Sequence, residues 1–204
     1  MGVYLYPSGT ETELKNAYIG GVYEYSYDFV GKTISQIAND WWQWTSWWTN
    51  TSDGIYRNSW GNPMYISLAW MHTALATATK VTMKIWVYVT KWTWTRDVAC
   101  RVWDSWKANA YFWVYFGWQN TDNNFAGTSG WTTYSYTWAT VFTLIYDLVN
   151  KTLSISSTDG NSITPNTYSL TDSYIASVVN GERIYIQQNW TYSKMKSVSL
   201  TIEL

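Results

Sequence analysis

The sequence of 204 residues has little charge, only one cysteine and only one histidine. Charged residues make up 13% of the chain, about half of the ordinary share of about 25%. The 13 basic side chains are balanced by 14 acidic ones, so no excess of positive charge is available for phosphates and nucleic acid is not expected as a partner. The single cysteine, Cys100, excludes an internal disulfide and a cysteine-based zinc site.

Membrane and secretion signals are also missing from the pattern. The longest apolar run, residues 110–118, is about half of the length that a membrane-spanning helix needs, so no transmembrane segment is expected. Residues 1–10 have neither a basic start nor an apolar stretch, so no secretory signal peptide is expected. The localisation does not follow from these features, and a virion or an extracellular surface is our working expectation.

Aromatic residues are abundant, with 17 Trp, 18 Tyr and 5 Phe, or 20% of the chain. Apolar and polar residues alternate with the period of a half-buried strand in residues 23–29, 81–89, 134–138 and 198–204. The frequent Thr, Val, Ile, Tyr and Trp suit further strands, which we predict at residues 65–71, 110–116, 141–146, 152–157 and 183–188. The sequence therefore predicts an all-β fold in a single domain over residues 1–204.

Two segments compete with the strand pattern. Thr33 and Gln36 fit a helical capping box, but the crowded tryptophans of residues 41–48 would burden a helix. We therefore predict a short turn near residues 33–39 and a strand from Trp42, with a helix through residue 48 as the alternative. Residues 171–179, followed by Asn-Gly, fit one or two helical turns.

The C-terminal third carries a family resemblance. Residues 142–156 resemble the strand–turn–strand of legume-type and bacterial lectin-like domains, in which a Tyr-Asp pair precedes the turn, here Tyr146-Asp147. Asp159-Gly160 stands where that family often has a hairpin, and Met195–Leu204 is similar to its closing strand. The resemblance implies a concanavalin-like jelly-roll sandwich of two antiparallel sheets, as in LamG and L-type lectin domains. Such a fold does not by itself imply a function.

Catalysis would require carboxylates that the sequence does not place well. Retaining glycoside hydrolases need two carboxyl groups about 5–5.5 Å apart, and all five Glu residues lie towards the chain ends. Asp97 and Asp104 are the best-placed acids in mid-chain, but solvation at strand ends explains them more simply. His72, the single histidine, is assigned no role. We therefore expect a non-catalytic protein, with a glycoside hydrolase of the same fold as an alternative.

Calcium is the one metal that the sequence brings into consideration. Residues 118–125 are predicted to form a loop, whose composition resembles the calcium loop of legume-type lectins. Asn120, Asp122 and Asn124 carry suitable oxygen ligands. A single carboxylate is weak support, and Asn- and Asp-rich segments usually form turns. No metal or other cofactor is therefore predicted, and Ca²⁺ remains an alternative.

The surplus of aromatic residues points to a binding surface. A sandwich buries one face of each sheet, so part of the rings must be exposed, and contiguous exposed rings mark a partner. An exposed aromatic stripe is predicted at Trp86, Tyr88, Tyr134, Tyr136 and Trp138. A ligand-binding rim, for carbohydrate or another partner, is predicted at Trp42, Trp44, Trp118, Asn120, Asp122 and Trp131.

The expected partner is a glycan or other copies of the chain. We place lectin-like carbohydrate binding first. A self-assembling structural subunit, such as a capsid, spike or fibre protein of an archaeal virus, is the alternative, because a net charge of −1 favours association into a homo-oligomer.

Overall fold

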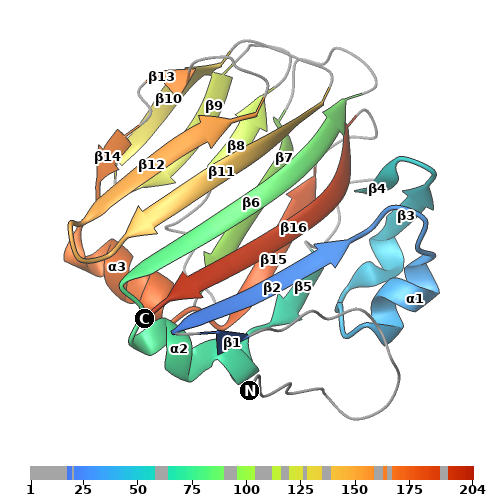
Figure 1. The fold of residues 1–204 in the computed structure, drawn as a ribbon. Helices are drawn as coiled ribbons and strands as arrows, with labels where there is room; N and C mark the ends of the chain where they lie inside the picture. The colour runs from blue at the N-terminus through green and yellow to red at the C-terminus, as the bar shows by residue number, and fades with distance from the viewer. Residues whose placement is uncertain are drawn as a thin grey trace.

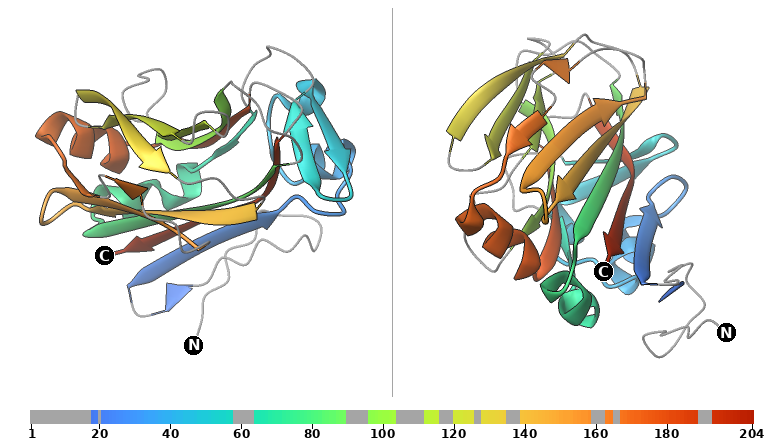
Figure 2. Two further views of the ribbon diagram at one scale, coloured as in Figure 1. Left: turned by 90° about the horizontal axis from the view of Figure 1, so that it is seen from above. Right: turned by 60° about the vertical axis from the view of Figure 1, so that its left-hand side comes forward.

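The computed structural model describes residues 18–19, 21–57, 64–89, 96–103, 112–115, 120–125, 128–134, 139–158, 163–164, 167–188 and 193–204. Their strands pair antiparallel in two sheets, which Figures 1 and 2 show as the two layers of a sandwich. The prediction of an all-β fold with two antiparallel sheets is confirmed. In the described part of the chain, no helix has the length and apolar character needed to cross a membrane.

Sheet A has nine described strands, and its central order is β1-β2-β16-β6-β11-β12-β14. The hairpin β3–β4 joins this sheet through β16. The bounds are β1 Tyr18–Ile19, β2 Val22–Asp28, β3 Trp48–Thr51, β4 Gly54–Arg57, β6 Lys80–Val89, β11 Ala139–Asp147, β12 Thr152–Ser157, β14 Thr167–Ser169 and β16 Ser193–Glu203.

Sheet B has seven described strands in the order β13-β10-β9-β8-β7-β15-β5. Their bounds are β5 Met64–Ser67, β7 Arg96–Trp103, β8 Phe112–Tyr115, β9 Asn120–Phe125, β10 Thr128–Tyr134, β13 Ile163–Thr164 and β15 Arg183–Gln188. The helical elements are α1 Ile34–Asn39, α2 His72–Ala76, α3 Asp172–Val179 and the 3₁₀ turns η1 Thr45–Trp47 and η2 Ala69–Met71.

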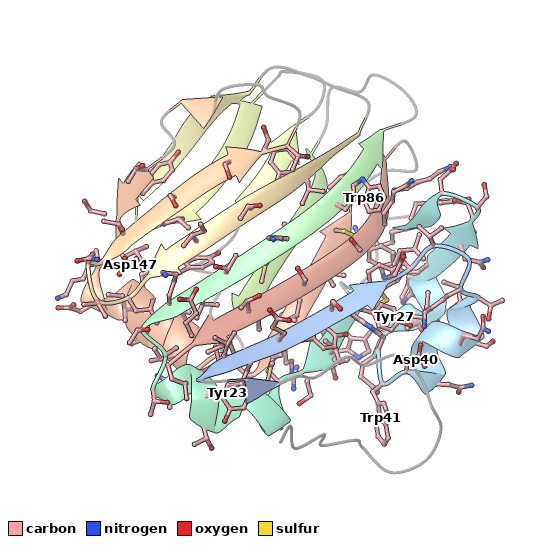
Figure 3. All side chains as sticks on the ribbon, viewed as in Figure 1. Tyr23, Tyr27, Asp40, Trp41, Trp86 and Asp147 are labelled. Atoms are coloured by element: carbon pink, nitrogen blue, oxygen red, sulfur yellow. The ribbon has the colours of Figure 1, made fainter. Side chains whose placement is uncertain are left out.

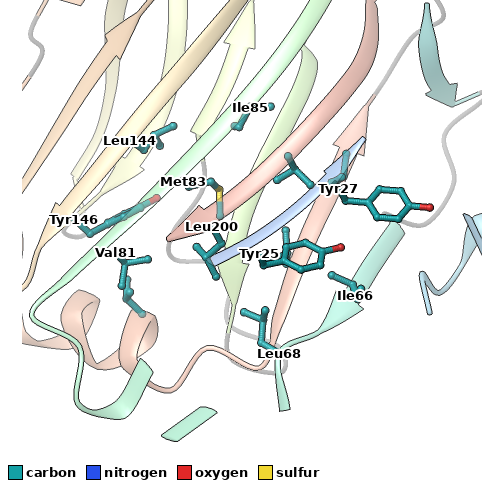
Figure 4. Packing of buried hydrophobic residues seen from close by; sticks show 14 of the residues in the cluster. Tyr25, Tyr27, Ile66, Leu68, Val81, Met83, Ile85, Leu144, Tyr146 and Leu200 are labelled. Carbon is teal, nitrogen blue, oxygen red and sulfur yellow. The ribbon is translucent and has the colours of Figure 1, made fainter. Parts of the chain in front are cut away.

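The core lies between the sheets and follows the period-two pattern. On β6 the side chains at positions 81, 83, 85 and 87 are buried, while Lys84 and Trp86 are exposed. The neighbouring strand β16 places Val198 opposite Ile85 and Leu200 opposite Met83, and Figure 4 shows several of these side chains in the packed interior. One face of sheet A therefore supplies an aliphatic layer, as the alternation predicts.

Sheet B divides its residues between two faces in the same way. The core takes Met64 and Ile66 from β5 and Ile184 and Ile186 from β15. The intervening residues, Tyr65 and Tyr185, are directly opposed in the register and belong to the outer face. Tyr185 is only 4% exposed, yet it is separate from the core cluster, so the outer face has a packed group of its own.

The segment 33–48 differs in part from its prediction. The capping box is present, since the Thr33 hydroxyl accepts from the Gln36 backbone and the Gln36 side chain accepts from the Thr33 backbone. The strand predicted from Trp42 is wrong: only Gln43 forms a bridge, and β3 begins at Trp48. Left-handed backbone at Trp41 (φ 73°) and Trp44 (φ 62°) interrupts the extended conformation that a strand requires.

Three further predictions are settled by the described elements. The helix at residues 171–179 is confirmed as α3, capped by the Thr171 hydroxyl. The strand at residues 65–71 ends at Ser67, and His72 begins α2 rather than ending a strand. The loop predicted at residues 118–125 is wrong over residues 120–125, because β9 pairs with β8 on one side and β10 on the other. Two ladders of backbone hydrogen bonds outweigh the turn preference of Asn and Asp.

The β3–β4 hairpin packs closely against β16 at Gly54. Its φ is +124°, and a Cβ there would overlap the carbonyl oxygen of Met195. We expect Gly54→Ala to lower the free energy of unfolding by about 2–4 kcal/mol, from backbone strain and overpacking together. The measurement is urea unfolding at equilibrium.

Gly21 is the matched control for this substitution. Its φ is also positive, at +88°, but a Cβ there would meet none of the described atoms within 4 Å. Gly21→Ala is therefore expected to cost only the conformational term of about 1–2 kcal/mol. Equal losses for the two variants would contradict the close packing at Met195.

Candidate functional site

An aromatic cluster with one guanidinium group lies on the outer face of sheet B, near the edge formed by β5. It consists of Trp44, Tyr65, Tyr185 and Arg183, and we call these four residues the platform. The Tyr65 and Tyr185 ring centroids are 5.4 Å apart, and the Trp44 ring meets Tyr65 edge-on at 4.8 Å and 86°. The Arg183 Cζ atom lies 4.5 Å from the Tyr65 ring centroid.

The platform depends on a backbone bridge that extends the sheet by one residue. The Gln43 N–H donates to the Tyr65 carbonyl at 2.8 Å, and the Tyr65 N–H donates to the Gln43 carbonyl at 3.2 Å. Continued extended backbone after Gln43 would turn the next side chain to the core. The left-handed conformation of Trp44 changes that direction, and its ring instead contacts Tyr65 and stays 38% exposed.

One of the predicted rim residues, Trp42, lies in the core. The side chain immediately before Gln43 is directed inward, and Trp42 is only 1% exposed. Its ring packs 5.2 Å from Phe29 and 5.6 Å from Tyr27, measured between centroids. Trp42 therefore belongs to the core, and the prediction that it contacts a ligand is wrong.

A buried carboxylate anchors the segment that carries Trp44. Asp40 accepts from the Tyr27 hydroxyl at 2.6 Å and from Lys32 Nζ at 3.0 Å, both at Oδ2. Its backbone also ends α1, because the Asp40 N–H donates to the carbonyls of Gln36 and Ala38. Burial, with the hydrogen bond and the charge of Asp40, raises the pKa of Tyr27 well above its ordinary value.

Arg183 gives the platform a fixed positive charge. Its Nη1 donates to the Tyr185 hydroxyl at 3.0 Å, and its charge faces the Tyr65 ring. Partial burial alone would lower the pKa of Arg183, but the hydrogen bond to Tyr185 and the nearby Tyr65 and Glu182 raise it above its ordinary value. The guanidinium is therefore charged at every practical pH.

The sheet register connects the platform to three predicted rim positions. Position 131 on β10 is the Cα partner of 122 on β9, which pairs in turn with 113 on β8 and, through 99, with 187 on β15. Position 187 is two residues from Tyr185, so this row belongs to the face that carries the platform. Asn120 is two residues from Asp122 on the same strand. The side chains of Asn120, Asp122 and Trp131, and all of Trp118, lie outside the described part.

Trp86 lies on the other sheet. It is 37% exposed on the outer face of sheet A, as predicted, and Lys196 Nζ lies 4.6 Å from its ring centroid. Figure 3 shows Trp86 over sheet A, apart from Trp41 below α1. Tyr134 ends β10 in sheet B, so the predicted stripe is divided between two sheets. The side chains of Tyr88 and Tyr134, and residues 135–138, lie outside the described part.

Most of the candidate acids and metal ligands have side chains outside the described part of the structure. Asp97 lies within β7, while its side chain and all of Asp104 are outside the described part of the structure. Among the described side chains, no group of three or more His, Cys, Asp or Glu is placed to hold a metal ion. The side chains proposed for calcium at residues 120–124 fall outside that set.

Tyr65, Tyr185 and Arg183 were not identified by the sequence analysis. The alternation Arg183-Ile184-Tyr185-Ile186 was a usable signal, because it puts Arg183 and Tyr185 on one face of the predicted strand. The pairing of β15 with β5 was not indicated by any pattern in the sequence. These strands are separated by more than a hundred residues of sequence.

Comparison with known proteins shows a shared fold. No protein-family model and no curated protein matches the sequence. The chain is similar to a sialidase of Trypanosoma rangeli in complex with sialic acid, at 9% identity and a TM-score of 0.56 over 92% of this chain and 30% of that chain. A second structure of this sialidase gives 10% identity and a TM-score of 0.54 over 76% of this chain and 26% of that chain.

Galectin LEC-6 of Caenorhabditis elegans is more distant in structure, with 10% identity and a TM-score of 0.44 over 69% of this chain and 91% of that chain. The chain thus spans less than a third of the length of the sialidase chains that it matches. At these identities the likeness to the sialidase shows the fold alone.

The buried hydrogen bonds that Asp40 accepts from Tyr27 and Lys32 form a network that can be tested at Tyr27. Tyr27→Phe removes one of the two donors to Asp40, and we expect a loss of about 1–3 kcal/mol in the free energy of unfolding at neutral pH. Because the pKa of Tyr27 is raised in the folded state, its stabilising effect is complete below the ordinary value of 10.0 and declines as the pH rises further. The difference between wild type and variant should therefore shrink above pH 10. A difference that stays constant to pH 11 would contradict the network.

Backbone strain at Trp41 can be tested by substitution. It is 57% exposed and left-handed, a conformation that is unfavourable for a large side chain and tolerated by Asn. Trp41→Asn should raise the free energy of unfolding by about 0.5–1 kcal/mol. Trp47, which is 49% exposed and lies in η1, is the control, and Trp47→Asn should give no gain. Chemical denaturation of both variants decides, and a loss at position 41 would count against strain there.

Proposed function

We propose that this chain is a concanavalin-like β-sandwich that binds carbohydrate without catalysis, and that the ligand rests on the platform. The observation that carries the proposal is the exposed edge of the aromatic group, where Trp44 and Tyr65 meet at right angles beside Arg183. Sugar rings present apolar C–H faces that pack on aromatic rings, and their hydroxyls need hydrogen-bond partners. A ligand site with this mixture of apolar surface and few polar groups is typical of small-molecule binding.

The backbone of Trp44 adds independent support. A tryptophan held in the left-handed region is unfavourable by about 1–3 kcal/mol, and such conformations gather at functional sites. Here the unfavourable conformation keeps the ring on the outer face, against Tyr65. By backbone register, the row of positions 131, 122, 113 and 187 crosses sheet B beside the platform.

Self-assembly is the second candidate. It is favoured by the exposed rings of Trp41 and Trp47, since large exposed apolar side chains mark protein interfaces. The low charge and the net charge of −1 act in the same direction. In this case the chain would be a structural subunit, as in a capsid, spike or fibre, and these tryptophans would contact neighbouring copies.

The test of carbohydrate binding is a glycan array, followed by calorimetric titration of the glycans that bind. Trp44→Ala and Tyr65→Ala should each weaken binding about tenfold or more, because each removes an aromatic surface at the centre of the site. Trp86→Ala is the matched control, since it removes a tryptophan of similar exposure from the other sheet, and it should leave binding unchanged.

Two outcomes would overturn this proposal. One is the absence of any glycan bound by a folded wild-type chain, and the other is a loss of binding with Trp86→Ala but not with Trp44→Ala. Light scattering over a concentration series distinguishes the second candidate. A constant mass equal to the 23.7 kDa chain contradicts assembly, and defined oligomers that dissociate on Trp41→Ala or Trp47→Ala support it.

A further inference from the structure

Four lysines of the described residues form ion pairs with carboxylates, and Arg183 differs from them. The recorded pairs are Lys32–Asp40, Lys80–Glu203, Lys151–Asp172 and Lys194–Asp53. For Arg183 the structure records no carboxylate within 4.0 Å among the described residues, although Glu182 contributes to its electrostatic surroundings. Its positive charge on the platform is thus not neutralised by a direct contact there.

The surroundings of Arg183 fix the guanidinium and leave part of it unused. One side faces the Tyr65 ring at 4.5 Å, and Nη1 donates to the Tyr185 hydroxyl at 3.0 Å. A guanidinium has five N–H donors in a planar fork. The recorded hydrogen bond uses one of them, which leaves donors for a planar anionic group. Because the fork is already oriented, little side-chain entropy is lost when such a group binds.

The position of Trp44 sets where the rest of the ligand lies. Both the Trp44 ring and the Arg183 Cζ atom are measured from the Tyr65 centroid, at 4.8 and 4.5 Å, so they are at most 9.3 Å apart. This upper bound puts Arg183 within about one or two sugar rings of Trp44. A sugar packed on Trp44 can therefore present a substituent to Arg183 without moving the platform.

We propose that the platform selects acidic glycans, with the carboxylate or sulfate of the sugar bound by Arg183 while a sugar ring packs on Trp44. This inference rests on the proposed function and deepens it. A carboxylate matches the guanidinium fork with two parallel hydrogen bonds, and a sulfate presents the same pair of oxygens. Neutral glycans would leave the charge of Arg183 without a partner and would bind more weakly.

The test compares three probes that share one core: lactose, 3′-sialyllactose and 3′-sulfolactose. They are accompanied by an array of other neutral, uronic-acid and sulfated glycans. The wild type should bind at least one acidic class, and Arg183→Gln should weaken that binding about 10- to 100-fold, as expected for loss of a charged hydrogen-bonded pair. Arg183→Lys, which keeps the charge and loses the fork, should recover less than half of the lost binding free energy. Thermal melting of each variant confirms that the fold is retained.

Lys196→Gln is the matched control. It also removes a cation that faces an aromatic ring, but on sheet A, and it should leave acidic binding unchanged. Wild-type binding that is confined to neutral glycans, or an equal loss for neutral and acidic glycans in Arg183→Gln, would overturn the inference and leave carbohydrate binding standing. Binding to no glycan of any class would overturn the proposed function as well. Preference between the sialylated and sulfated probes identifies which anion the fork takes.

Discussion

The buried carboxylate of Asp40 is the interaction on which the rest of the site depends. It ends α1, takes hydrogen bonds from Tyr27 and Lys32, and fixes the point at which the tryptophan-rich segment leaves the helix. A buried charge is stable only with such partners, so the segment has little freedom to move away. From this fixed point the chain reaches the Gln43 bridge within three residues. The bridge sets Trp42 inward, and the left-handed backbone of Trp44 turns its ring outward.

In both sheets the alternation of side chains separates an inward face from an outward face. Inward positions build an aliphatic core, to which β6 and β16 contribute the central layer. Outward positions on sheet A are mainly hydroxyl and charged side chains with Trp86 among them, whereas sheet B has tyrosines at positions 65 and 185. A packed group outside the core is unusual for a solvated sheet face, and it gives this face a preorganised surface.

The fold was largely predictable from the sequence, because its strongest signals are local. These signals are the alternation in residues 81–89 and 198–204, the capping box at Thr33 and Gln36, and the Asn-Gly pair that follows residues 171–179. Each of them depends on neighbours in the chain. The site was less predictable. Trp42 and Trp44 are the same residue type, two positions apart in the sequence. Only the bridge to β5 and the left-handed backbone of Trp44 distinguish the buried ring from the exposed one. The strand at residues 120–125 was hidden for a similar reason, since its pairing partners outweigh its turn-forming residues.

The most direct measurement of the central claim is the response of individual tryptophan indole N–H signals in ¹H–¹⁵N spectra during titration with a bound glycan. Trp44→Phe and Trp86→Phe variants assign the two signals. We predict that the Trp44 signal shifts with saturation while the Trp86 signal stays in place. A shift of Trp86 alone, with Trp44 unchanged, would place the ligand on sheet A and contradict the account.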